Sequence, residues 1–206
     1  NMPWLPLILI YGLIGFKIGG LKLSLTIVAS FLFITFTGVL PQALLSIYLC
    51  GIAVIISFIL GSSLGIWAAH NDKVSSFMRP INDTMQTMPS FVILIPFVMF
   101  FGIGEFTALL AIIAYAFVPA MRYTEHGLRN LPETVIEAAR MIGCSQTQLL
   151  WKVKIPLAMP VIMLGLNQTI MFGLAMLVIA ALVGTTGLGQ LIYIGLSKAD
   201  FGTGMI

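Results

Sequence analysis

Long apolar runs separated by short polar stretches dominate the pattern of this 206-residue chain. Six of the runs are candidate membrane helices, at about residues 3–16, 23–40, 43–69, 84–101, 106–121 and 157–183. A membrane span needs roughly 20 residues, so the first run is short and the third is long enough to tilt or protrude. A further apolar piece at 188–196 is too short to cross and is typical of a re-entrant or interfacial turn. The pattern therefore predicts an all-α, polytopic membrane protein.

Basic residues mark one side of these predicted spans. The ten lysines and arginines are Lys17, Lys22, Lys73, Arg79, Arg122, Arg129, Arg140, Lys152, Lys154 and Lys198. With six spans, the first nine all fall on the same side of the membrane, and the positive-inside rule makes that side cytoplasmic. The side of Lys198 stays open. The net charge of +3 is too small and too dispersed to indicate a nucleic-acid partner.

The composition, at 59% hydrophobic and 8% charged residues, fits a lipid environment. Within the six predicted spans there is no Asp, Glu, Lys, Arg or His, and Asp83 and Glu105 stand at span edges. Ion-driven carriers usually keep ionisable groups at membrane depth, because those groups carry the coupling. We therefore expect the energy for any transport to enter from elsewhere. Coupling through backbone carbonyls alone is the alternative.

A polar stretch interrupts the apolar pattern at residues 137–156, "EAARMIGCSQTQLLWKVKIP". Gly143 suits the left-handed position that closes a helix. The sequence "SQTQ" at 145–148 matches a capping box that opens a second helix, and we expect Pro156 to end that helix before the next span. The stretch predicts a helix, a glycine corner and a second helix on the cytoplasmic side.

Two interpretations of this hairpin are open from its residues alone. It is either a loop that lies along the lipid headgroups with its basic side chains toward anionic lipid, or a docking element for a partner groove. The short side chains of Ala138 and Ala139 would permit the close approach that docking requires. Composition does not choose between the two.

Other motifs exclude or weaken particular chemistries. The chain has no G-x-x-x-x-G-K-[ST] sequence, so it has no P-loop of its own for nucleotide phosphates. The spacing between Cys50 and Cys144 argues against a disulfide or a metal site, and His70 and His126 are expected to be polar loop residues. "GSSLG" at 61–65 has the small-xxx-small spacing of close helix packing, with a gating seam as the alternative.

A transport pathway would pass the polar and proline-broken parts of the spans. Pro89, preceded by Met88, interrupts the fourth run, and a proline frees backbone groups that need a neighbouring helix or a wet cavity. The adjacent amides Asn167 and Gln168 are the most polar pair within a run, and Met171 shares a helical face with Asn167. Hydrogen bonding between helices is the alternative role for the amides. We take Met88, Pro89, Asn167 and Met171 as pathway candidates.

The hairpin sequence resembles a known signature. "EAA" at 137–139, Gly143 three residues later and Pro156 at the loop's end resemble the EAA motif of permease subunits of binding-protein-dependent ABC importers. The tail differs slightly, since Ile155 directly precedes the proline in "VKIP". "QTMPSFVILIPFVMFFGIGE", "KIPLAMPVIMLGLNQTIM" and "GTTGLGQLI" resemble the glycine betaine/proline betaine branch, and the likeness covers roughly residues 43–206.

The resemblance implies an all-α transmembrane domain of the type I, MetI-like ABC importer class at 43–206. The apolar runs predict N-terminal membrane helices at 1–42, a first run that has lost its beginning, and a last span starting near "FGTGMI" that is incomplete. The resemblance also implies a conduit in a bacterial inner membrane and not an enzyme. ATP and Mg would bind to a separate ATPase dimer, and an extracytoplasmic binding protein would deliver the solute to a permease homodimer. The resemblance assigns ATPase coupling to Glu137, Ala138, Ala139 and Gly143, and an outer loop to Gly187 and Gly189.

Two other transporter classes and a second solute class are the alternatives. A passive channel would need no docking hairpin, and a secondary carrier is disfavoured by the lack of charge within the predicted spans. The solute is expected to be of the glycine betaine, proline betaine or choline type, and a permease for another small solute of the same class is the alternative.

Overall fold

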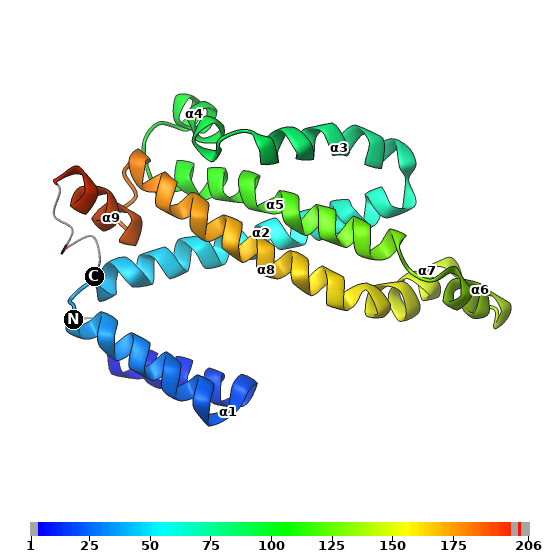
Figure 1. Cartoon of the computed structure of the whole chain (residues 1–206), viewed down its shortest axis with the longest axis horizontal. Helices are drawn as coiled ribbons and strands as arrows, with labels where there is room; N and C mark the ends of the chain where they lie inside the picture. Colours follow the sequence, from blue (N-terminus) through cyan, green and yellow to red (C-terminus); the bar gives the residue numbers. More distant parts are fainter. Residues whose placement is uncertain (1–3, 199–201, 203–206) are drawn as a thin grey trace. The chain divides into compact units, whose positions relative to one another are not determined.

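The computed structural model describes residues 4–198 and 202, and every regular element in that part of the chain is helical (Figure 1). The elements, in chain order, are α1 (Trp4–Phe36), α2 (Leu40–His70), α3 (Asp72–Thr87), α4 (Ser90–Phe101), α5 (Glu105–Arg129), α6 (Glu133–Met141), α7 (Gln146–Gln148), η1 (Leu149–Lys154), α8 (Ile155–Ala180), η2 (Ala181–Val183) and α9 (Leu188–Ser197). The predicted all-α class is confirmed. The predicted start of a further span at 201–206 lies outside the described residues, apart from Gly202.

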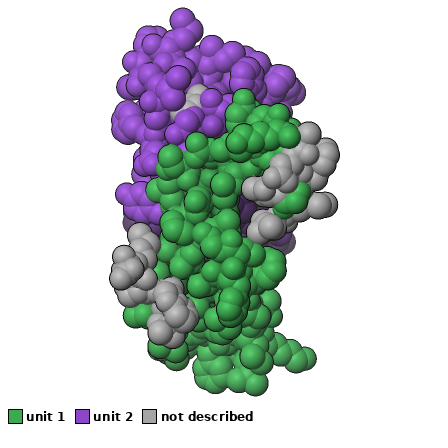
Figure 2. Space-filling model, turned by 90° about the vertical axis from the view of Figure 1, so that its left-hand side faces the viewer, with its two compact units in different colours: residues 1–47, 186–206 green, residues 48–185 purple. Residues whose placement is uncertain are grey.

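The chain divides into two compact units, shown in different colours in Figure 2. One contains residues 1–47 and 186–206, and the other contains residues 48–185. The first holds α1, the start of α2 and α9, whereas the second holds the rest of α2 and all elements from α3 to η2.

In the first unit, α1 is a helical hairpin and not one straight helix. The backbone breaks at Gly19 and Gly20, and Gly20 has φ of 71°, a value that glycine adopts without a Cβ clash. The rings of Tyr11 and Phe31 stack with centroids 5.1 Å apart, although a straight helix would separate them by about 30 Å. The Ser24 hydroxyl also donates to the Gly12 carbonyl at 2.8 Å. The two apolar runs predicted at 3–16 and 23–40 are the arms of this hairpin.

In the second unit, the apolar run predicted at 84–101 is not one straight helix. Polar α3 and apolar α4 meet at an angle of 101°, so the predicted span is a bent pair whose corner lies at Met88 and Pro89. Met88 has an extended backbone, because the residue before a proline is sterically disfavoured in the α-helical region. Among the described residues, four helical segments are long and apolar enough to cross a membrane, namely the hairpin α1 taken as a whole, α2, α5 and the continuous helix from Gln146 to Ala180, and the bent pair of α3 and α4 is a fifth candidate.

Helix α5 lies at the centre of this unit, packed along α8. Small residues let α2 approach it closely. A Cβ on Gly61 would lie 2.5 Å from the Phe117 carbonyl oxygen, and one on Gly65 would lie 2.6 Å from that of Met121. The packing role predicted for 61–65 is therefore confirmed, with α5 as the partner.

Helix α5 also continues past the predicted end at residue 121. It reaches Arg129, so Arg122, Glu125, His126 and Arg129 lie on a helix that qualifies as a span by length and hydropathy. The predicted end of this helix is therefore wrong, and so is the placement of His126 in a loop, whereas the run 106–121 itself contains no Asp, Glu, Lys, Arg or His. At 1.5 Å per residue its 25 residues measure about 37 Å, more than the hydrocarbon core of a bilayer. Polar contacts with α3 accompany the turns of α5 beyond residue 121.

Candidate functional site

The first helix of the predicted hairpin is α6, which begins directly after Pro132. Glu133 lies in its first turn and Arg140 in its last, each on the favourable side of the helix dipole. Ala139 is buried, whereas the side chains of Glu137 and Ala138 are exposed. Glu137 and Ala138 therefore present a short, accessible surface, whereas Ala139 packs inward.

Gly143 forms the corner after α6. Its φ is 87°, and the N–H of Gly143 donates to the Arg140 carbonyl at 2.9 Å. The N–H of Cys144 donates to the Ala139 carbonyl at 3.3 Å, so both bonds satisfy carbonyls left open at the helix end. Apart from the two chain neighbours of Gly143, no described residue has an atom within 4 Å of a Cβ built there. The requirement for glycine here is one of backbone conformation and not of space.

The capping box predicted after the corner is also confirmed. The Ser145 N–H donates to Gln148 Oε1 at 3.0 Å, and the Gln148 N–H donates to Ser145 Oγ at 3.3 Å. The helix that starts here then widens into the π-helical segment η1 and continues as α8.

The prediction that Pro156 ends this second helix is wrong. Pro156 lies in the first turn of α8, and the helix runs without a break from Gln146 to Ala180. The Ile155 N–H bonds to the Leu150 carbonyl five residues back, so the hydrogen-bond pattern shifts immediately before the proline. Because proline has no N–H, it is tolerated at such a shift. The polar hairpin is thus joined rigidly to a membrane helix.

The hairpin ends in an apolar tip. Met141 is 89% exposed and Ile142 is 84% exposed, next to the corner at Gly143. Within this unit, α6 and α7 lie beyond the ends of α5 and α8 (Figure 1). Met141 and Ile142 therefore form an exposed apolar tip at the end of the polar helix α6.

The pathway candidates lie on two elements. Asn167 and Met171 lie near the middle of α8 on an exposed face, opposite the buried residues Gly165, Thr169 and Gly173. Gln168 is half-buried, and neither its side chain nor that of Asn167 makes a hydrogen bond within the described chain. Met88 and Pro89 are exposed at the corner between α3 and α4. The structure therefore does not unite the four candidates in one cavity.

The outer-loop glycines belong to the first unit. Gly187 and Gly189 are both buried at the start of α9. The Leu188 N–H donates to Ser46 Oγ on α2 at 2.9 Å, and a Cβ on Gly187 would lie 2.6 Å from that oxygen. The loop is thus held tightly against the start of α2.

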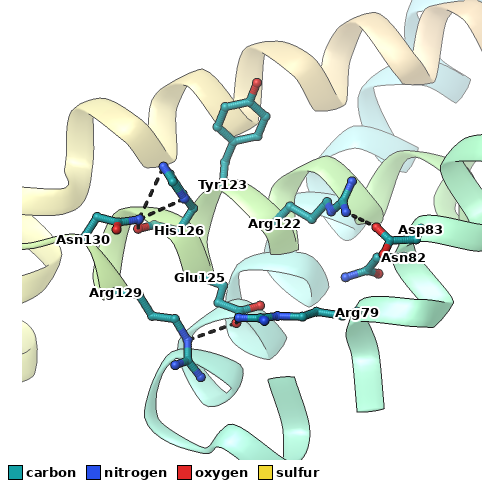
Figure 3. A pocket seen from close by; sticks show the side chains of 9 residues that line it. All are labelled: Arg79, Asn82, Asp83, Arg122, Tyr123, Glu125, His126, Arg129 and Asn130. Atoms are coloured by element: carbon teal, nitrogen blue, oxygen red, sulfur yellow. Dashed lines mark hydrogen bonds and ion pairs between the residues drawn. The ribbon is translucent and has the colours of Figure 1, made fainter. Parts of the chain in front are cut away.

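A cluster of charged residues between α3 and α5 was not predicted. It surrounds a cavity of about 540 Å³ in the second unit (Figure 3). The cavity is lined by Arg79, Asn82, Asp83, Arg122, Tyr123, Glu125, His126, Arg129 and Asn130. Asn82 is 2% exposed, and its Oδ1 has no hydrogen-bond partner in the described chain.

Two groups of contacts hold this cluster together. Arg122 on α5 pairs with Asp83 and with the amide oxygen of Gln86, both on α3. One turn further along, the Glu125 carboxylate accepts from the Ser75 hydroxyl at 2.5 Å and pairs with Arg129 at 3.0 Å. Directional polar contacts therefore connect both ends of α3 to α5.

A periodic signal for this cluster was present in the sequence. Arg122, Glu125 and Arg129 are spaced by three and four residues, which places them on one face of a helix. Hydropathy alone ends the predicted span at residue 121 and places these residues in a loop, because it does not register the spacing of charged side chains. Cys50 and Cys144 are both free thiols.

Comparison with known proteins identifies the class. Residues 61–206 match the family of inner membrane components of binding-protein-dependent transport systems, and the chain belongs to this family.

Three relatives show the similarity. The chain is 44% identical over 166 residues to a trimethylamine N-oxide transport system permease protein, TmoV, of Pelagibacter ubique, covering 81% of this chain and 23% of that protein. It is 39% identical over 171 residues to the glycine betaine/proline betaine permease protein ProW of Escherichia coli, covering 83% and 48% of the two chains. It is 37% identical over 170 residues to the glycine betaine permease protein OpuAB of Bacillus subtilis, covering 82% and 60%. The chain therefore spans less than two thirds of the length of each relative.

Solved structures confirm the MetI-like fold. The chain superimposes on a subunit of the MetNI methionine ABC transporter in an inward-facing form, with a TM-score of 0.70 and 21% identity. The match covers 76% of this chain and 79% of that one. An amino acid ABC transporter crystallised with histidines gives a TM-score of 0.66 at 18% identity, covering 80% and 81% of the two chains. At these identities the likeness concerns the fold.

Proposed function

We propose that this chain is the membrane-spanning part of an ABC importer that moves a small methylated zwitterion inward. The observation that carries the proposal is the exposed helix α6 with its left-handed glycine corner at Gly143, in a member of this transport family. Glu137, Ala138, Ala139 and Gly143 form the surface that seats in a partner ATPase. That partner binds ATP and Mg, and this chain contributes no catalytic step.

The solute class follows from what the relatives transport. Trimethylamine N-oxide, glycine betaine and proline betaine, after which three relatives are named, share a fully substituted positive nitrogen and a negative oxygen. An extracytoplasmic binding protein delivers this solute to a homodimer of the permease. Tight recognition of the cationic nitrogen by aromatic rings is expected in the binding protein, because tight binding in the conduit would slow release.

The proposed orientation places α6 in the cytoplasm, since nine of the ten basic residues then lie on the inner side. The region 43–206 forms the importer domain, and 1–42 adds N-terminal membrane helices. Asn167, Met171, Met88 and Pro89 are proposed to border the path, and Gly187 and Gly189 to shape the outer mouth.

Reconstitution tests this function. The full-length permease, its ATPase subunit and its binding protein are placed in proteoliposomes that contain ATP, and uptake of radiolabelled glycine betaine is measured. Excess unlabelled trimethylamine N-oxide, proline betaine, choline or methionine serves as competitor. ATP-dependent uptake that the methylated compounds reduce and methionine does not supports the proposal. Uptake that methionine alone reduces would contradict the solute class, and uptake without ATP would contradict the importer class.

A further inference from the structure

We propose that Glu125 is a positioning residue for transport. It fixes the position of the coupling helix α6 relative to α2 and α3. This inference rests on the proposed function, because it assigns Glu125 to the transmission of movement from the ATPase. Glu125 lies on α5, and its carboxylate contacts Ser75, Arg79 and Arg129. Its role is exerted through Arg129.

The first step in the argument is the environment of Glu125. The residue is 8% exposed, and its carboxylate accepts from the Ser75 hydroxyl at 2.5 Å. Arg129 Nε lies 3.0 Å from the same oxygen, and Arg79 Nη2 lies 3.9 Å away (Figure 3). A buried carboxylate is costly unless charged and hydrogen-bonding partners compensate. These partners therefore hold the Glu125 side chain in one conformation.

Arg129 extends the contacts to two further elements. Its Nη1 pairs with Asp72 at the start of α3 at 2.8 Å, and its Nη2 donates to the Ala68 carbonyl near the end of α2 at 2.7 Å. The guanidinium therefore bonds to three helices at once, through a planar donor set that a lysine does not reproduce. Together, Glu125 and Arg129 join the ends of α2, α3 and α5.

The connection to the coupling helix is short. Arg129 is the last residue of α5 and Glu133 is the first of α6, so three residues separate the two helices. Even fully extended, three residues span only about 10 Å. The connection is also partly hydrogen-bonded, because the Asn130 N–H donates to the His126 carbonyl at 3.1 Å. A displacement of α6 therefore displaces Arg129 as well, because the connecting residues are few and partly hydrogen-bonded.

Polar contacts decide where α3 lies. Its buried residues are Ser75 and Asn82, and neither is apolar. Ser75 bonds to Glu125, Asn82 Nδ2 lies 3.4 Å from the Met121 sulfur, and Asp83 pairs with Arg122. By contrast, α2 and α5 are held by close contacts at glycines. Because α3 leads into the corner at Met88 and Pro89, a shift of α5 transmitted by Glu125 would move that corner.

The experiment compares variants in the proteoliposome system described above. Glu125→Gln keeps the size of the side chain but removes its charge, Arg129→Gln removes the other charge, and the double variant removes both. Lys73→Gln is the control, since Lys73 is an exposed charged residue of α3 without an ion pair in the described chain. The readout is the amount of solute transported per ATP hydrolysed, measured beside complex yield and melting temperature.

We expect Glu125→Gln to lower transport per ATP about tenfold in a complex of normal yield, with Lys73→Gln unchanged. The double variant should transport at least as much solute per ATP as the more impaired single variant, because both changes break the same connection. An unchanged ratio in Glu125→Gln, or additive losses in the double variant, would overturn the inference. If glycine betaine uptake by the unaltered complex is absent, the proposed function fails; if it is normal and Glu125→Gln is normal too, only this inference fails.

Arg129→Lys covers the case in which Glu125→Gln does not assemble. This variant keeps the positive charge but loses the planar set of donors to Asp72 and Ala68. A lowered ratio in an assembled Arg129→Lys complex supports the inference, and an unchanged ratio overturns it. Loss of assembly in both variants overturns it as well, because the cluster would then be required for folding and not for coupling.

Discussion

The backbone N–H of Leu188 donates a hydrogen bond of 2.9 Å to the hydroxyl of Ser46, 142 residues earlier in the chain. This bond fastens the start of α9 to α2, and it requires a residue without a Cβ at the neighbouring position 187.

Gly187→Ala should therefore destabilise this unit, because the new Cβ would lie 2.6 Å from Ser46 Oγ. The φ of Gly187 is −85°, so steric overlap and not backbone strain is the cause. We expect a cost of about 1–3 kcal/mol, seen as a lower melting temperature in detergent. Ser46→Ala alone should cost about 1 kcal/mol through loss of the hydrogen bond. Combining the two should be less harmful than the sum of the single changes; strict additivity would contradict the contact.

Gly143 should be needed for its backbone conformation alone. Gly143→Leu should uncouple ATP hydrolysis from uptake while the chain still inserts in the membrane, since φ is 87° and a side chain there is strained by about 1–2 kcal/mol. Gly143→Asn is the matched control, because asparagine tolerates the left-handed region and the space is open. Normal uptake by Gly143→Leu in vesicles with its ATPase would refute the coupling role.

Gly65 and Gly51 give a matched pair on α2. Gly65→Ala should lower the yield of folded protein, because its Cβ would lie 2.6 Å from the Met121 carbonyl oxygen, a backbone atom. Gly51→Ala meets nothing within 4 Å and should be neutral, or stabilising by roughly 0.5–1 kcal/mol through helix propensity. Melting temperatures of the two variants in detergent check this directly. Equal effects would show that α2 and α5 do not pack closely at Gly65.

The orientation can be checked by accessibility. In a background with Cys50 and Cys144 replaced by serine, Asn130→Cys should react with membrane-impermeant thiol reagents only from the cytoplasmic side. Ile103→Cys should react only from outside, since Ile103 is 75% exposed in the turn between α4 and α5. Inside-out and right-side-out vesicles separate the two cases. The opposite labelling would invert the topology and remove the docking role of α6.

Asn167 and Gln168 should differ in their roles. Asn167→Leu should lower uptake while ATP hydrolysis persists, because Asn167 lies on the exposed face of α8. Gln168→Leu should act mainly on assembly or thermal stability, since Gln168 is half-buried. Uptake, ATP hydrolysis and melting temperature are measured for each variant. Intact uptake in both, or a transport defect confined to a stably assembled Gln168→Leu complex, would contradict this assignment.

The features that the sequence alone determined are local. Apolar run lengths indicated membrane helices, Gly143 indicated a helix corner, and the pattern at 145–148 indicated a capping box that is present with both of its hydrogen bonds. Each of these depends on residues within one or two helical turns, since hydropathy, backbone conformation and capping are short-range effects. The EAA spacing likewise required no tertiary information.

The features that only the tertiary structure decided depend on residues distant in sequence. The 101° corner at Met88 and Pro89, the continuation of α5 to Arg129 and the passage of the helix through Pro156 all departed from the local pattern. A local pattern indicates where a helix is favourable, but a helix continues or bends according to the partners its backbone and side chains find. Glu125 lies buried on α5 because Ser75, 50 residues away, and Arg129 compensate its charge, and the α9 loop is fixed because Ser46 reaches Leu188.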